Sequence, residues 1–135
     1  MALQLSAAVR NAMLDAIETT IGTSAVLKIR TGAPPASVAT ADSGTVLATL
    51  TLPSDWMAGA SSGSKAKSGT WEDASADAAG TAAHYRIYAS DGTTAHLQGT
   101  VTATGGGGDL NVDNVVFAAG QSFTVTSYSW TAANS

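Results

Sequence analysis

The chain has no cysteine among its 135 residues. It can therefore form neither a disulfide nor a thiolate metal site, which suits folding in a reducing cytosol. Charged residues are scarce too, at 12% of the chain, about half the usual share in globular proteins, and Ala, Thr, Ser and Gly take their place. This composition predicts a neutral surface of small side chains that is suited to close packing.

Two classes of partner are not expected. The formal charge of -4 arises from a few charges spread along the chain, with no basic stripe that could follow a phosphate backbone. No run of 18 apolar residues occurs, and residues 1–8 lack a basic segment followed by an apolar one. We therefore expect no nucleic-acid partner, no membrane partner and no secretion signal.

The pattern predicts one helix over residues 6–21, with Ser6 as N-cap and Gly22 as C-cap. Apolar residues recur there at four-residue spacing: Val9, Met13, Ile17 and Ile21, with Ala12 and Ala16 beside them. The charged residues lie off this stripe: Arg10, Asp15 and Glu18. The stripe is expected to press on a sheet, with the charged side in solvent.

The rest of the chain predicts a mostly-β fold within a single domain covering residues 1–135. Alternating apolar residues favour strands within 25–52 and 81–131, whereas residues 53–80 show no clear periodicity and are expected to form a long loop. Six short strands with glycine-rich turns and one helix indicate an antiparallel β-sandwich, or a small barrel, with an N-terminal α-helix.

The hairpin over residues 81–103 is expected to turn at a three-residue loop with Gly92 in the left-handed conformation. The register that sorts the faces pairs Ile87 with Ala95, Tyr85 with Leu97, Ala83 with Gly99, Arg86 with His96, and His84 with Gln98. Apolar Ala83, Tyr85, Ile87, Ala95 and Leu97 would then face the core, and His84, Arg86, Tyr88 and His96 would face solvent.

No enzyme chemistry is expected. The two histidines, grouped with Arg86, Tyr88 and Asp91, either form a site or a polar ladder across strands, and the ladder is favoured. Asp109, Asn111, Asp113 and Asn114 resemble the opening of a calcium loop, but Asn114 replaces its glycine and Gly120 its bidentate glutamate. The glycines at 105–108 precede a strand rather than a helix and predict a flexible loop. No cofactor or metal is expected.

Residues 53–80 contain large side chains that a loop rarely carries. They supply the candidate partner interface: Trp56, Met57, Lys65, Lys67 and Trp71. Large aromatic residues in an irregular segment anchor that segment to its own core or anchor a partner to it, and the sequence leaves both open.

Four stretches carry a resemblance: LSAAVRNAMLDAIETTIGTSAVLKIRTGAPPA, SGTVLATLTL, GTAAHYRIYASDGTTAHLQGTV and GDLNVDNVVFAAGQSFTVTSYSWT. Together they resemble a family of small virion structural proteins of tailed bacteriophages, whose members are described as head-decoration or tail proteins. The resemblance implies a virion component assembled in the host cytoplasm, with other phage structural proteins and copies of itself as partners.

Three roles are compatible with this resemblance. A capsid decoration or cement subunit that stabilises the head is favoured, and a tail-tube, collar or other tail-associated subunit is the alternative. A glycan- or receptor-binding module with Trp56, Trp71 or Trp130 as stacking platforms is the third.

Overall fold

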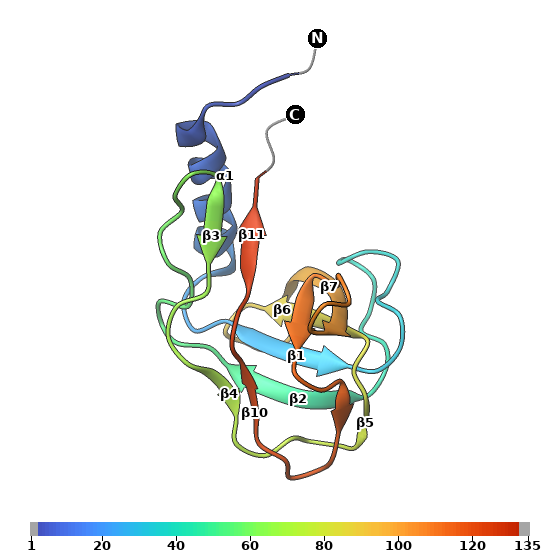
Figure 1. Cartoon of the computed structure of the whole chain (residues 1–135). Helices are drawn as coiled ribbons and strands as arrows, with labels where there is room; N and C mark the ends of the chain where they lie inside the picture. Colours follow the sequence, from blue (N-terminus) through green and yellow to red (C-terminus); the bar gives the residue numbers. More distant parts are fainter. Residues whose placement is uncertain (1–2, 133–135) are drawn as a thin grey trace.

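The structure is a computed structural model that describes residues 3–132. Within them lie one helix and eleven strands, arranged as a β body from which α1, β3 and β11 project side by side (Figure 1). The elements are α1 (Ala7–Ile21), β1 (Val26–Arg30), β2 (Val46–Thr51), β3 (Ser64–Ala66), β4 (Trp71–Asp73), β5 (Gly80–Thr81), β6 (His84–Tyr88), β7 (Ala95–Ala103), β8 (Leu110–Val112), β9 (Val116–Phe117), β10 (Phe123–Val125) and β11 (Ser129–Thr131).

The main sheet has the strand order β2-β1-β6-β7-β8 and curls into a half-barrel. Three two-stranded pairs complete the body and the projecting part: β4 with β10, β5 with β9, and β3 with β11. The predicted mostly-β class with one N-terminal helix is confirmed. The core inside the half-barrel includes Leu27, Ile29, Leu50 and Ile87, which are fully buried.

The bounds of α1 follow the predicted capping signals. The Ser6 hydroxyl accepts a hydrogen bond from the Val9 amide at 3.2 Å, and the Gly22 amide donates to the Glu18 carbonyl at 2.9 Å. Gly22 has a φ of 95°, which explains why glycine ends this helix.

The predicted orientation of α1 holds at its C-terminal end, where Ile21 is buried in the core and Ile17 packs against it, but not in its first half. Val9 and Met13 remain 46% and 50% exposed, and Leu14 and Ile21 are the buried helix residues. The charged side of the helix instead lies against the segment around β3, where backbone amides and a buried lysine supply its partners. Hydrogen bonding of these polar groups therefore outweighs burial of Val9 and Met13. Leaving a buried donor unpaired costs more free energy than burying a Val or Met side chain would contribute.

The hairpin of β6 and β7 places Tyr85, Ile87 and Leu97 at the core as predicted, but Ala83 and Ala95 are only half-buried outside the core, and the register differs from the predicted one. Ile87 lies opposite Leu97 and Tyr85 opposite Gly99, two residues further along β7 than expected. The turn is longer because the Asp91 carboxylate accepts hydrogen bonds from the amides of Thr93 and Thr94. The predicted left-handed Gly92 is confirmed, with a φ of 71°.

The strands β7 and β8 are parallel, the exception in an otherwise antiparallel sheet. The glycines at 105–108 make the short return possible, because a Cβ on Gly106 or Gly108 would lie within 2.8 Å of Thr102. The Thr102 hydroxyl accepts a hydrogen bond from the Gly108 amide at 2.9 Å. The predicted flexible loop is therefore packed onto its own strand.

Residues 53–80 are not the long loop that was predicted, since they contain β3 and β4 and lead into β5. Their partners β11, β10 and β9 come from the C-terminal part of the chain, too distant in sequence for local periodicity to reveal the pairing. Trp56 and Trp71 are fully buried with ring centroids 6.0 Å apart. The chain's own core therefore buries both tryptophans.

Replacing either buried tryptophan should destabilise the folded protein. Trp56→Ala or Trp71→Ala is expected to lower the free energy of unfolding by about 3–5 kcal/mol, because each leaves a large cavity. Val116→Ala is the matched control, since Val116 is 58% exposed and its change should stay within about 0.5 kcal/mol. Urea denaturation of the three variants measures this, and unchanged stability of both tryptophan variants would contradict the described core.

Candidate functional site

The five side chains predicted to form a partner interface are mostly internal. Trp56, Met57, Lys65 and Trp71 are buried within the chain, and Lys67 is half-buried. Lys67 donates a hydrogen bond to the Gly69 carbonyl at 2.8 Å and lies over the Trp71 ring. Of this set, only Lys67 offers accessible surface to a partner, so the candidate contact surfaces must be sought elsewhere.

Lys65 has an internal role. Its side chain is 2% exposed, and its ammonium donates to Asp15 Oδ1 at 2.7 Å, Glu18 Oε1 at 2.9 Å and the Ala58 carbonyl at 2.8 Å. Burial by itself would lower the pKa of Lys65, but the hydrogen bonds that its ammonium donates to Asp15 and Glu18 outweigh burial and raise this pKa. Lys65 is therefore a charged anchor that holds α1 against β3.

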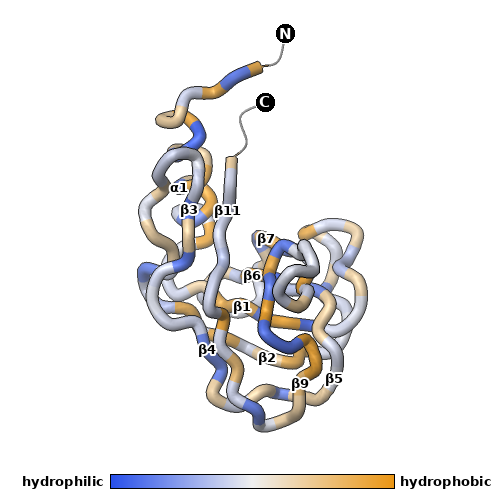
Figure 2. The backbone as a smooth tube through the Cα atoms, viewed as in Figure 1, coloured by the Kyte–Doolittle hydropathy of each residue, from blue (hydrophilic) through white to orange (hydrophobic). Residues whose placement is uncertain are grey.

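The outer face of α1 is the first candidate contact surface: Val9, Met13, Ala16, Ile17 and Thr20. None of these side chains carries a charge, and a cavity of about 290 Å³ lies between this face, Ile21 and His96. Figure 2 shows hydrophobic stretches along this projecting N-terminal part as well as in the body. The apolar stripe was recognised in the sequence, but its exposure depends on contacts that the sequence does not show.

A groove between β7 and β11 is the second candidate contact surface. It has a volume of about 310 Å³ and is lined by Tyr85, Leu97, Gln98, Asp109, Tyr128, Ser129, Trp130 and Thr131. Its floor is fixed, because the hydroxyls of Tyr85 and Tyr128 lie 2.7 Å apart and Trp130 Nε1 donates to the Tyr128 hydroxyl at 2.8 Å. Burial raises the pKa of Tyr85, so this phenol stays neutral.

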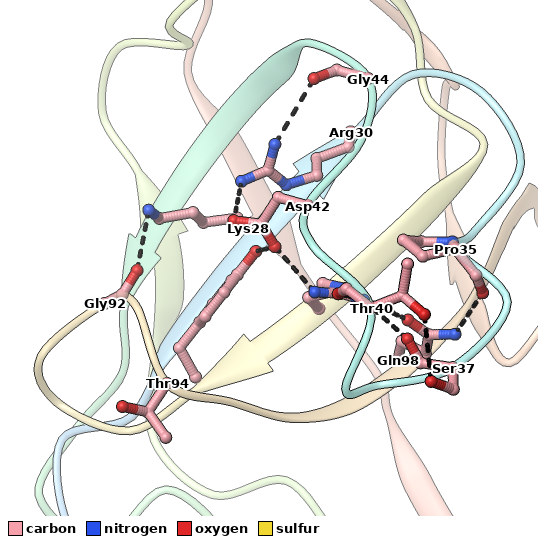
Figure 3. Close-up of polar contacts among 12 residues, drawn as sticks. Lys28, Arg30, Pro35, Ser37, Thr40, Asp42, Gly44, Gly92, Thr94 and Gln98 are labelled. Carbon is pink, nitrogen blue, oxygen red and sulfur yellow. Dashed lines mark hydrogen bonds and ion pairs between the residues drawn. The ribbon is translucent and has the colours of Figure 1, made fainter.

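The predicted solvent face of β6 is covered. Residues 31–45, here called the strap, cross it, and Asp42 on the strap accepts hydrogen bonds from Arg30, Arg86 and Tyr88 at 2.8–3.0 Å (Figure 3). Burial opposes ionisation of Asp42, but the Tyr88 hydroxyl and the two guanidinium groups lower its pKa.

More hydrogen bonds close the strap over the sheet. Arg86 Nη2 donates to the carbonyls of Ser37 and Thr40, and Gln98 Nε2 donates to the Pro35 carbonyl at 2.8 Å (Figure 3). The prediction that His84, Arg86 and Tyr88 face solvent is therefore wrong, whereas His96 is exposed as predicted. Period-two alternation shows which residues share a face but not whether a loop covers that face.

The two histidines do not form a site. His84 lies opposite Thr100 rather than Gln98, is fully buried, and places Nδ1 2.6 Å from the Gly32 carbonyl. Burial lowers the pKa of His84, and the nearby charges of Arg30 and Arg86 lower it further. The imidazole is therefore neutral and cut off from any substrate.

Of the four residues that resemble a calcium loop, Asp109 and Asn111 bind within the β7–β8 connection, whereas Asn114 accepts a hydrogen bond from the Val116 amide. Asp109 accepts hydrogen bonds from the amide and hydroxyl of Thr100, and Asn111 accepts one from Thr102. Within residues 3–132, no group of three or more His, Asp or Glu side chains is placed to hold a metal ion. Over the same residues, the helix is too short and insufficiently apolar to cross a membrane.

Comparisons of the chain with models of protein families, with curated proteins and with solved structures give no match. The outer face of α1 and the groove between β7 and β11 therefore carry the functional argument.

The buried neutral His84 predicts a pH effect on stability. The folded-state pKa of His84 is below the usual 6.5. At pH values between the two pKa values, His84 therefore binds a proton in the unfolded chain but not in the folded one. The contribution of His84 to stability is therefore present above pH 6.5 and is lost as the pH falls from there through the lowered folded-state pKa. The slope cannot exceed about 1.4 kcal/mol per pH unit for one group.

Denaturation of wild type and His84→Gln between pH 7.5 and 5 measures this effect, with the variant expected to show the smaller slope. His96→Gln is the matched control, because His96 is exposed and its replacement should keep the wild-type slope. Equal slopes for all three proteins would contradict the structural assignment of His84.

Proposed function

We propose that the chain is a non-catalytic structural subunit of a tailed-phage virion, and specifically a capsid decoration or cement subunit. The observation that carries this proposal is the uncharged, apolar outer face of α1 on a part of the molecule that projects from the β body (Figure 1). In this role, that face binds a neighbouring structural protein and stabilises the head through protein–protein contacts.

The direction in which α1 faces supports a role in binding proteins. Arg10 donates to the Ala132 carbonyl at 3.3 Å, and Asp15 and Glu18 bind Lys65, so all three charges point toward the chain itself. Scattered exposed apolar residues are common, but a contiguous apolar surface rimmed by polar residues marks a protein contact. The resemblance to virion structural proteins agrees with this role.

The other two roles receive unequal support. A tail-tube or collar subunit remains the second candidate, because the groove between β7 and β11 offers a surface through which copies could join into a ring. The glycan-binding role loses two of its three stacking platforms, since Trp56 and Trp71 are fully buried. Only the half-buried Trp130 remains available for stacking.

Binding to phage heads tests the proposal. Heads of the phage that encodes the chain, assembled without it, should bind the purified subunit, and Met13→Glu should weaken this binding at least about tenfold, or about 1.4 kcal/mol. A charge at the centre of the apolar face would have to be desolvated in the contact. Because Met13 is 50% exposed, the stability of the free subunit should change by no more than about 0.5 kcal/mol.

Val116→Glu is the matched control, because it also places a carboxylate on an exposed apolar residue, but in β9 on the body. It should bind heads as wild type does. Cosedimentation and binding isotherms give the affinities. Undiminished binding of Met13→Glu, or no binding of the wild-type subunit to heads, would overturn the proposal.

A further inference from the structure

One phenol hydroxyl in the groove between β7 and β11 has a hydrogen that no acceptor of the described residues takes. The hydroxyls of Tyr85 and Tyr128 lie 2.7 Å apart, and the Tyr128 oxygen also accepts the hydrogen bond from Trp130 Nε1. Two hydroxyl hydrogens are present, and only one of them can lie between the two oxygens. Whichever phenol donates to the other, the second hydrogen is available to a molecule in the groove, which both phenols line.

The Asp109 carboxylate supplies an acceptor in the same groove. The Thr100 amide and hydroxyl both donate to its Oδ2, at 2.9 and 3.1 Å, and Oδ1 accepts no hydrogen bond from residues 3–132. Gly99 lets this carboxylate approach Tyr85, because a Cβ at Gly99 would lie 2.8 Å from Tyr85 Cε1 and 2.9 Å from Asp109 Oδ2. A ligand in the groove therefore meets both a donor and an acceptor that have no partner within the described chain.

The backbone of β7 offers little room for an added strand. The Val101 amide donates to the Ala83 carbonyl, and backbone groups alternate in direction along a strand, so Gln98 and Thr100 turn theirs away from β6. The Thr100 amide is already bound to Asp109, which leaves Gln98 to supply the open backbone groups where β7 lines the groove. Because strand addition needs several consecutive open positions, a compact ligand fits this groove better than an extended peptide.

Trp130 and Leu97 provide the apolar surface of the groove. The indole of Trp130 is half-buried, unlike those of Trp56 and Trp71, and its bond to the Tyr128 hydroxyl fixes the orientation of the ring. A sugar ring combines apolar C–H faces, which pack on an aromatic ring, with hydroxyls that both donate and accept hydrogen bonds. The groove volume of about 310 Å³ lies at the lower end of the range for ligand pockets, which suits one or two sugar rings.

We propose that this groove binds a neutral saccharide, with a phenol hydroxyl and Asp109 Oδ1 bound to the sugar hydroxyls and Trp130 packed against the ring. The ligand is neutral because Asp109 is the one charged residue among the described residues that line the groove, and its carboxylate repels the acid group of an anionic sugar. This site goes beyond the proposed function. The groove shares no lining residue with the cavity at the outer face of α1, so sugar binding and head binding through Met13 are tested separately.

Nuclear magnetic resonance titration of the isotopically labelled chain tests the site. The neutral probes are methyl glucoside, methyl galactoside and N-acetylglucosamine, and glucuronate is the anionic probe. At least one neutral probe should shift the Trp130 indole N–H signal saturably, with a dissociation constant of about 1–10 mM, as expected for a ligand of roughly a dozen non-hydrogen atoms. Glucuronate should bind at least about tenfold more weakly, because its charge approaches that of Asp109. Trp130→Phe assigns the signal, and the Val116 amide, outside the groove, should not shift.

Asp109→Asn tests the role of the carboxylate. Asparagine keeps an oxygen for the bonds from Thr100 but replaces the free acceptor with an amide N–H group, so the neutral probe should bind at least about tenfold more weakly. Asp113→Asn is the matched control, because Asp113 is exposed and lies outside the groove, and it should bind the probe as wild type does. No saturable shift with any neutral probe, equal affinities of Asp109→Asn and wild type, or tighter binding of glucuronate would show that the groove is not a site for neutral saccharides.

Discussion

The buried ammonium of Lys65 determines which way the helix faces. A cation that is 2% exposed must be paired, and both carboxylates that pair with it, Asp15 and Glu18, stand on α1. The same side of the helix receives the amides of Met57, Ala60 and Gly63. Because the polar side of α1 is bound in this way, Val9 and Met13 face outward, and the proposed contact surface depends on an internal ion pair.

The β body buries several of its aromatic and ionisable side chains. Trp56 and Trp71 fill the core, and the strap buries Arg86 and His84 beneath Asp42. These four side chains are thereby withdrawn from solvent, whereas His96 and the apolar residues Val9 and Met13 of α1 stay exposed. This division suits a protein that works by contact with other proteins.

Local signals predicted the local structure. The Ser6 and Gly22 caps, the strand class and the left-handed Gly92 each depend on neighbouring residues, and each is confirmed. The burial of His84 and the strands within 53–80 depend on partners far along the chain, and the predictions there were wrong. The hairpin register was also wrong, because the turn at Asp91 is longer than the predicted three-residue loop. The contact of Lys65 with Asp15 and Glu18 sets the orientation of α1, and it joins segments about 50 residues apart, so no local pattern in the sequence indicates it.

The oxidation rates of Met13 and Met57, the two methionines other than Met1, test the outward orientation of α1 most directly. Met13 is 50% exposed on the outer face, and Met57 is 1% exposed beneath the helix. Exposed thioethers oxidise readily to the sulfoxide, so brief treatment of the dilute subunit with peroxide, followed by peptide mass spectrometry, reports both sites in one sample. The account predicts rapid oxidation of Met13 and slow oxidation of Met57. Equal rates, or faster oxidation of Met57, would show that the helix packs its apolar face inward.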